Sequence, residues 1–315
     1  MNAAIMMCCS ITKKWAALPF LLAIWLLFPG CAPNSYLLEP SINYVPPPGY
    51  IAHLDSPFPP LSTKERGQAW GKELWLASRF AQEEDYYRAI TCYKSALFLM
   101  PDSCNRALEA EYGIFLSYYL GQRFGQAIEQ FEGSRLKEVE SGFPALEELL
   151  AALCEAYLKV NQPIKAENIR CLLSLMGKKE LSSSLDLFSA TVQADLCNAP
   201  FACDYLAGAK SVQAAQTLNA LIPGAGYLYV GQGKTALTSF FLNTLFIAAA
   251  YQCFKHRNVP AGVIVSSFEF GWYVGGINGA GLAAKEYNER RYQTMAQNYL
   301  VQESLFPILL FQKGF

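Results

Sequence analysis

An apolar run without charged residues, from 236 to 254, constrains the fold of this chain more than any other feature. It is about as long as the ~20 residues that a helix needs to cross the hydrocarbon core of a bilayer. A second apolar run, from 259 to 277, follows the polar break at 255–257 and carries one charged residue, Glu269. Because backbone groups in lipid must be satisfied within helices or closed barrels, we expect an antiparallel transmembrane hairpin of two helices.

Small residues recur at every fourth position along the second run. Such a stripe lets two helices approach closely in lipid, where no hydrophobic drive holds them together. The sequence therefore predicts that the stripe packs on the first helix or on another copy of the chain. Its members are Ser267, Gly271, Gly275, Gly279 and Ala283.

Polar residues inside the two runs form a second candidate site. Glu269 and Asn243 lie at the same depth of a symmetric hairpin, so Asn243 and Thr244 are the expected hydrogen-bond partners of Glu269. An acid inside a membrane is either a proton or ligand contact or, when protonated, a hydrogen-bonding link between helices. One acid without His or Lys at its depth favours the second role.

A proline-glycine turn precedes the first run. Pro223 ends the preceding helix, and the glycines that follow permit a sharp turn. Residues 215 to 285 resemble a family of small two-helix bacterial membrane domains that carry the motif Pro-Gly-x-Gly-x-x-Tyr-x-Gly. The resemblance implies membrane insertion and no particular chemistry. The matching residues are Pro223, Gly224, Gly226, Tyr229 and Gly231.

The N-terminal region has the pattern of an export signal. Residues 1 to 30 contain two lysines, an apolar core and a short break before Cys31. This end resembles the bacterial lipoprotein cleavage site, which implies acylation of Cys31; an uncleaved anchor is the alternative. Residues 31 to 65 are rich in proline, and we expect an extended linker there.

Residues 66 to 180 contain an internal repeat. Ala89, Ala127 and Ala166 are spaced 38 and 39 residues apart, and each has an aromatic residue nine positions earlier. The pattern resembles tetratricopeptide (TPR) repeats, in which a small residue lets two helices touch. We therefore expect an all-α chain with a short TPR-like helical solenoid followed by a transmembrane helical hairpin. Capping and connecting helices fill 181–222, the turn and hairpin fill 223–284, and a C-terminal helix and tail fill 285–315.

The TPR resemblance places a concave inner face on the first helix of each repeat. Such a face could dock an extended peptide or a partner helix. The alternative is that its tyrosines only cover the solenoid's own core. The residues are Ser78, Gln82, Tyr112, Leu116, Tyr119, Glu155 and Lys159.

Composition and motifs limit the classes of function that this chain could have. A net charge of −1 with 16% charged residues argues against a nucleic-acid partner. No catalytic set, metal motif or cofactor motif is recognisable in the sequence. We expect a noncatalytic scaffold in the bacterial inner membrane, with its repeats facing the periplasm and binding an envelope protein or peptide. The alternative is an oligomerising hairpin in membrane lipid that serves as a transport or channel-accessory element around Glu269.

Overall fold

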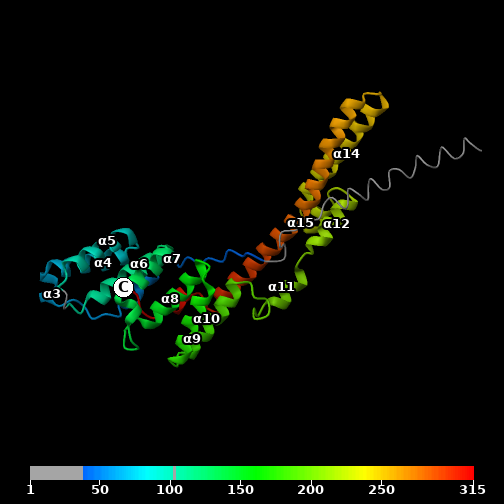
Figure 1. Cartoon of the computed structure of the whole chain (residues 1–315). Coiled ribbons are helices and arrows are strands. Elements are labelled where there is room, and N and C mark those ends of the chain that lie inside the picture. The colour runs from blue at the N-terminus through cyan, green and yellow to red at the C-terminus, as the bar shows by residue number, and fades with distance from the viewer. Residues whose placement is uncertain (1–37, 102–103) are drawn as a thin grey trace, which may run out of the picture. The chain divides into compact units, whose positions relative to one another are not determined.

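The computed structural model describes residues 38–101 and 104–315, and within these ranges it contains helices and no strands (Figure 1). The expected all-α class is confirmed for this part of the chain. The expected export signal and Cys31 lie outside the described residues.

Three antiparallel helix pairs follow one another along the chain. Their members are α4 (Ala69–Gln82) with α5 (Tyr86–Leu99), α6 (Ala107–Leu120) with α7 (Phe124–Gly133), and α8 (Leu146–Lys159) with α9 (Pro163–Leu175). Ala89, Ala127 and Ala166 are fully buried, because a methyl group is small enough to let the two helices of a pair touch.

The three pairs share one turn geometry. Each turn contains a residue in the left-handed region, at Glu84, Gln122 and Asn161 with φ of 63°, 58° and 59°. These residues are separated by the same 38 and 39 positions as the alanines. The internal repeat read from side chains is therefore also present in the backbone.

The described part of the proline-rich stretch is not an extended spacer. Residues 38–61 lie against the helix pairs, where Ile42 and Ile51 are buried and Tyr44 and Phe58 pack on the core. The stretch includes the short 3-10 helix η1 (Ile51–His53), and α3 (Thr63–Gly67) follows it. The physical reason is that apolar side chains are interspersed among the prolines and have a large apolar surface to cover.

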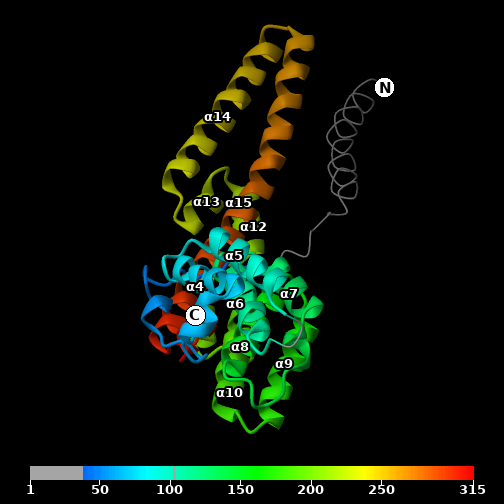
Figure 2. The same ribbon diagram turned by 90° about the vertical axis from the view of Figure 1, so that its left-hand side faces the viewer.

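The short η2 (Arg135–Glu138) lies between the second and third helix pairs. Four helices then lead from the third pair towards the apolar runs: α10 (Lys179–Val192), α11 (Ala202–Gly208), α12 (Val212–Leu221) and α13 (Ala225–Val230). The chain then forms α14 (Gly233–Lys255), a tight turn, α15 (Val259–Gln302) and η3 (Pro307–Leu310). Figure 2 shows α14 and α15 lying side by side. α12 and α13 pack against the middle of α15, around Ala280 and Ala284.

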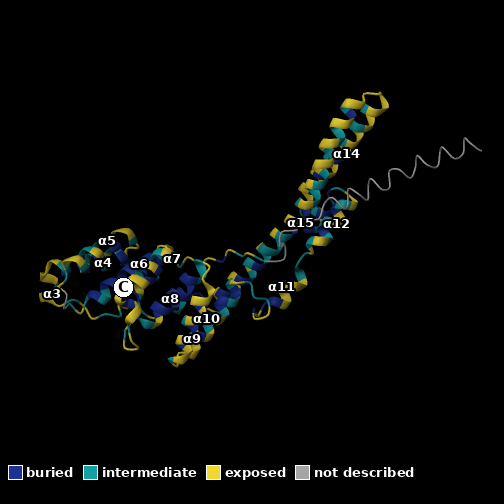
Figure 3. Cartoon of the chain, in the orientation of Figure 1, coloured by how far each residue is buried: buried dark blue, intermediate teal, exposed yellow. Residues whose placement is uncertain are grey.

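Among the described helices, α14 alone is long and apolar enough to cross a membrane. The sequence predicts a second membrane helix in the first half of α15, but this half does not meet the same criterion. Glycines, serines and Glu269 lower its mean hydropathy. Figure 3 shows the contrast in burial: buried residues gather along α6 and α8, whereas α14 is mostly exposed.

The second half of α15 belongs to the core of the helix pairs. Tyr292 is fully buried, its hydroxyl donates to the Thr191 carbonyl at 2.8 Å, and its ring lies 5.3 Å from that of Phe201. One helix of 44 residues therefore joins the apolar hairpin to the helix-pair core.

Candidate functional site

The inner face predicted for partner binding is largely covered by the chain itself. Tyr112, Leu116, Tyr119 and Glu155 are all buried. Two segments cover them: residues 38–61 on one side, and residues 305–315, which follow α15. Most of the residues predicted to line the groove therefore belong to the core of this structure.

Residues 305–315 contribute aromatic side chains to this face. Phe311 stacks on Tyr119, with ring centroids 6.0 Å apart, and Phe306 stacks on Tyr44 at 4.8 Å. The Gln312 backbone N–H donates to Glu148 Oε1 at 3.1 Å. The segment lies against α8, because that helix offers it an apolar surface and a hydrogen-bond acceptor.

A buried polar cluster lies at the end of the inner face. The Tyr119 hydroxyl donates to Glu155 Oε2 at 2.5 Å, and Lys159 Nζ donates to Asn43 Oδ1 at 2.6 Å and to the Ile42 carbonyl. Burial raises the pKa of the Glu155 carboxyl and lowers the pKa of the Lys159 ammonium. Both groups are thus shifted towards their neutral forms, and the lysine serves to hold residues 42–43 in place.

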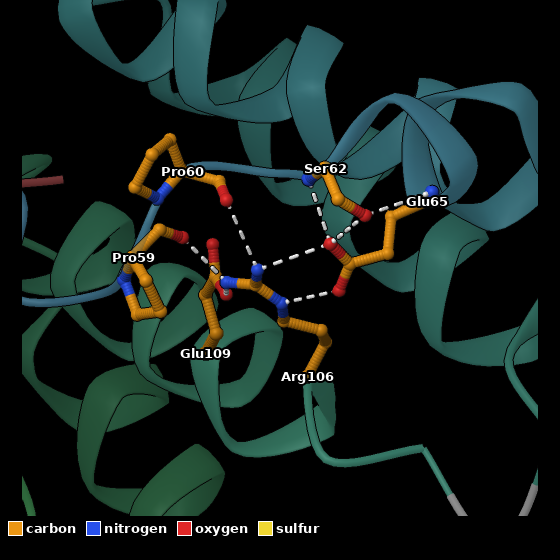
Figure 4. Close-up of polar contacts among 6 residues, drawn as sticks. All are labelled: Pro59, Pro60, Ser62, Glu65, Arg106 and Glu109. Carbon is orange, nitrogen blue, oxygen red and sulfur yellow. Dashed lines mark hydrogen bonds and ion pairs between the residues drawn. The ribbon is translucent and has the colours of Figure 1, made fainter.

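Arg106 links the proline-rich stretch to the helix pairs through hydrogen bonds and ion pairs (Figure 4). Its guanidinium donates to the carbonyls of Pro59 and Pro60 at 2.6 and 3.3 Å. It also pairs with Glu65 at 2.9 Å and with Glu109 at 2.8 Å. Five donors in a planar fork let one arginine serve all four partners, which lysine cannot do.

One part of the inner face remains open. A cavity of about 620 Å³ lies at the first helix pair, and its lining includes Ser78, Gln82, Trp75 and Tyr112. The guanidinium groups of Arg66 and Arg79 lie 5.9 and 5.7 Å from the centroid of the Trp75 ring, which is 39% exposed. This cavity brings together only Ser78, Gln82 and Tyr112 of the predicted groove residues.

No known family model, curated protein or solved structure matches this chain. Its function must therefore be argued from its own geometry.

The polar residues of the hairpin have distinct environments. Thr244 Oγ1 donates to the Phe240 carbonyl of its own helix at 2.8 Å, so its hydroxyl is not directed to Glu269. Asn243 is 2% exposed, and its Nδ2 donates to the Ser239 carbonyl. Within the described residues, Asn243 Oδ1 and both Glu269 carboxyl oxygens are buried without a hydrogen-bond partner.

The stripe of small residues divides into two halves. A Cβ added at Gly279 would lie 2.2 Å from the Tyr227 hydroxyl, and Ala283 is buried beside α12 and α13. A Cβ added at Gly271 or Gly275 would meet nothing within 4 Å. With Ser267, these two glycines line an open groove of about 560 Å³ along α14 and α15. Of the predicted stripe, therefore, only Gly279 and Ala283 are packed against other helices of this chain.

Within the described residues, no group of three or more His, Cys, Asp or Glu side chains is placed to hold a metal ion. Sequence reasoning missed the residues that cover the inner face, namely Ile42, Phe58, Phe306, Ile308 and Phe311. The available signal was the presence of large apolar side chains in two stretches without helical periodicity.

Proposed function

We propose that this protein is a noncatalytic, membrane-anchored scaffold of the bacterial cell envelope, in which a TPR-like solenoid binds a protein partner and a transmembrane hairpin provides the anchor. The TPR assignment is supported by the three helix pairs, their buried alanines and their shared left-handed turns.

The hairpin is supported by contacts between chain segments on either side of it. The Lys210 N–H donates to Asn288 Oδ1 at 2.7 Å, and Asn288 Nδ2 donates back to the Lys210 carbonyl at 2.8 Å. Segments in contact must lie on one side of a membrane. A crossing by α14 therefore requires a return crossing, and the apolar half of α15 is the segment that follows it.

The orientation follows from the N-terminal signal pattern. Export would place the helix pairs in the periplasm of a bacterium and the turn at Lys255–Arg257 in the cytoplasm, in agreement with the positive-inside rule. Protease accessibility in intact spheroplasts tests this arrangement. We expect cleavage of the helix pairs from outside and protection of the turn; protected helix pairs would invert the topology.

The open cavity is the observation that carries the partner-binding proposal, because it combines the exposed ring of Trp75 with polar side chains; residues 55–61 and 313–315 form part of its wall and leave it open. A photo-cross-linking amino acid placed at Gln82 in cells tests it. We expect one discrete adduct with an envelope protein. The matched control is Leu175, which is 86% exposed on α9, away from the cavity lining. Equal adducts at both positions, or none at Gln82, would contradict the proposal.

The open half of the small-residue stripe favours a second candidate function. Gly271 and Gly275 could receive a helix from another copy, giving an oligomer that acts as a transport or channel-accessory element around Glu269. Native mass spectrometry in lipid nanodiscs separates the candidates. An oligomer that is lost when Gly271 and Gly275 are both replaced by leucine favours this second function, whereas a monomer favours the scaffold.

A further inference from the structure

We propose that the break between α12 and α13 is a re-entrant loop, which enters the bilayer from the side of the helix pairs and contacts lipid acyl chains. The inference rests on the proposed hairpin and extends it. The membrane-embedded unit would then comprise three elements: α14, the first half of α15, and the ends of α12 and α13 that meet at Pro223.

The depth of the break follows from helix geometry. Lys234 and Lys255 bound α14 and lie 21 residues apart, about 32 Å at about 1.5 Å per residue, which matches a hydrocarbon core of about 30 Å. On α15, Tyr273 lies 14 residues beyond Val259, or about 21 Å from the turn. The Tyr273 hydroxyl donates to the Ala220 carbonyl. The end of α12 therefore lies inside the apolar layer.

Other contacts give the same depth. A Cβ at Gly276 would lie 3.3 Å from Asn219 Nδ2, and Gly276 is about 26 Å from the turn. The beginning of α12, by contrast, is paired through Lys210 with Asn288, about 44 Å from the turn. The chain therefore descends from outside the hydrocarbon layer at Lys210 into it at Ala220, and rises again to Lys234.

The surface of this segment suits lipid. No charged residue occurs between Lys210 and Lys234. Leu221, Ile222 and Leu228 are 74%, 57% and 66% exposed, and they continue the exposed apolar surface of α14 and α15. Large apolar side chains that project from a charge-free segment beside a membrane helix are covered at low cost by acyl chains.

Two backbone groups of the break, the Gly224 N–H and the Ala220 carbonyl, have side-chain partners within the protein, as a lipid environment demands. Pro223 has no N–H, so it cannot serve the carbonyl of Asn219, and the Gly224 N–H is diverted from its helical partner, the Ala220 carbonyl. The buried Asn219 side chain accepts from the Gly224 N–H at 2.8 Å, while Tyr273 donates to the Ala220 carbonyl.

The break also fits tightly against its neighbours. A Cβ at Gly224 would lie 2.3 Å from the Ala236 carbonyl oxygen, and a Cβ at Gly226 would lie 2.2 Å from the Ala215 carbonyl oxygen. The polar backbone thus faces protein, and the leucine and isoleucine side chains face outward.

Photolabelling of the unmodified full-length chain in lipid nanodiscs tests the inference. The probe is a phosphatidylcholine with a diazirine in the middle of one acyl chain, and adducts are mapped by mass spectrometry. Trypsin releases residues 211–234 as one peptide, 235–255 as the α14 peptide, and 171–178 as an exposed control from α9. We expect adducts on α14 and at positions 221–228, and none on the control.

The possible outcomes separate this inference from the proposed function. Adducts on α14 without adducts at 221–228 would overturn the re-entrant loop and leave the hairpin intact. No adducts on either peptide would remove the hairpin, and the re-entrant loop with it. Adducts on the control at the same level as at 221–228 would also overturn the inference, because labelling at 221–228 would then be no stronger than at a surface exposed to water.

Discussion

The ring of Phe311 stacks on that of Tyr119, with centroids 6.0 Å apart and planes 28° apart. The two residues lie 192 positions apart in the sequence, and both are buried. The contact joins the segment after the long helix α15 to the first helix of the second pair, so this segment and the second half of α15 share the core of the helix pairs.

Phe311→Ala should destabilise the helix pairs by about 3 kcal/mol, because it removes a buried ring and leaves a cavity. The measurement is thermal and chemical unfolding of the detergent-solubilised chain. Phe98→Ala is the matched control, since Phe98 is 89% exposed and its loss should change the stability by less than about 0.5 kcal/mol. Equal effects of the two substitutions would mean that residues 305–315 are not part of the folded core.

Glu65 should make the stability depend on pH in the acid range. Hydrogen bonds from Arg106, and then from Ser62, lower the pKa of its carboxyl from 4.5 to about 2. A lowered pKa means that the carboxylate contributes stability above about pH 4.5, and that this contribution is lost as the pH falls towards 2. Unfolding midpoints between pH 6 and pH 2 for the wild type and Glu65→Gln should therefore converge at low pH. Glu83→Gln, at an exposed position, serves as control, and a constant gap between the wild type and Glu65→Gln would contradict the ion pair.

Gly226→Ala should disrupt the packing of α13 on α12 and α15. The new methyl group would meet the Ala215 carbonyl oxygen at 2.2 Å and the Ala280 methyl at 2.7 Å, and backbone cannot move aside cheaply. We expect a loss of about 2 kcal/mol or more, read as a lower melting temperature in detergent. Gly271→Ala is the control, because its methyl group meets nothing within 4 Å. A well-folded Gly226→Ala with unchanged melting temperature would refute this close approach.

Asn219→Ala should cost about 1–3 kcal/mol, because it leaves the Gly224 N–H buried without an acceptor. Asn298→Ala is the control, because it removes an amide side chain at an exposed position. Hydrogen exchange of the Gly224 amide gives a direct readout. Strong protection in the wild type should be lost in Asn219→Ala and kept in Asn298→Ala; protection that survives in both would assign the amide another acceptor.

Several features of this protein were readable from the sequence alone because they are local. Alanines and aromatic residues at repeated spacing predicted three similar helix pairs, and the left-handed residues at Glu84, Gln122 and Asn161 recur with that spacing. Helical periodicity and small residues depend only on neighbours within a turn or two. Pro223 and Gly224 likewise marked the break before α14, where Gly224 has φ of 93°.

The tertiary structure decided which surfaces are covered and by what. Ile42 and Phe311 have no helical pattern around them, and their burial depends on contacts with helices more than a hundred residues away in the chain. Local pattern cannot predict such contacts, because the free energy of burial depends on area removed from water and not on sequence separation. For this reason Tyr112 and Tyr119 of the predicted groove are buried in the core, whereas the cavity beside Ser78 and Gln82 is open.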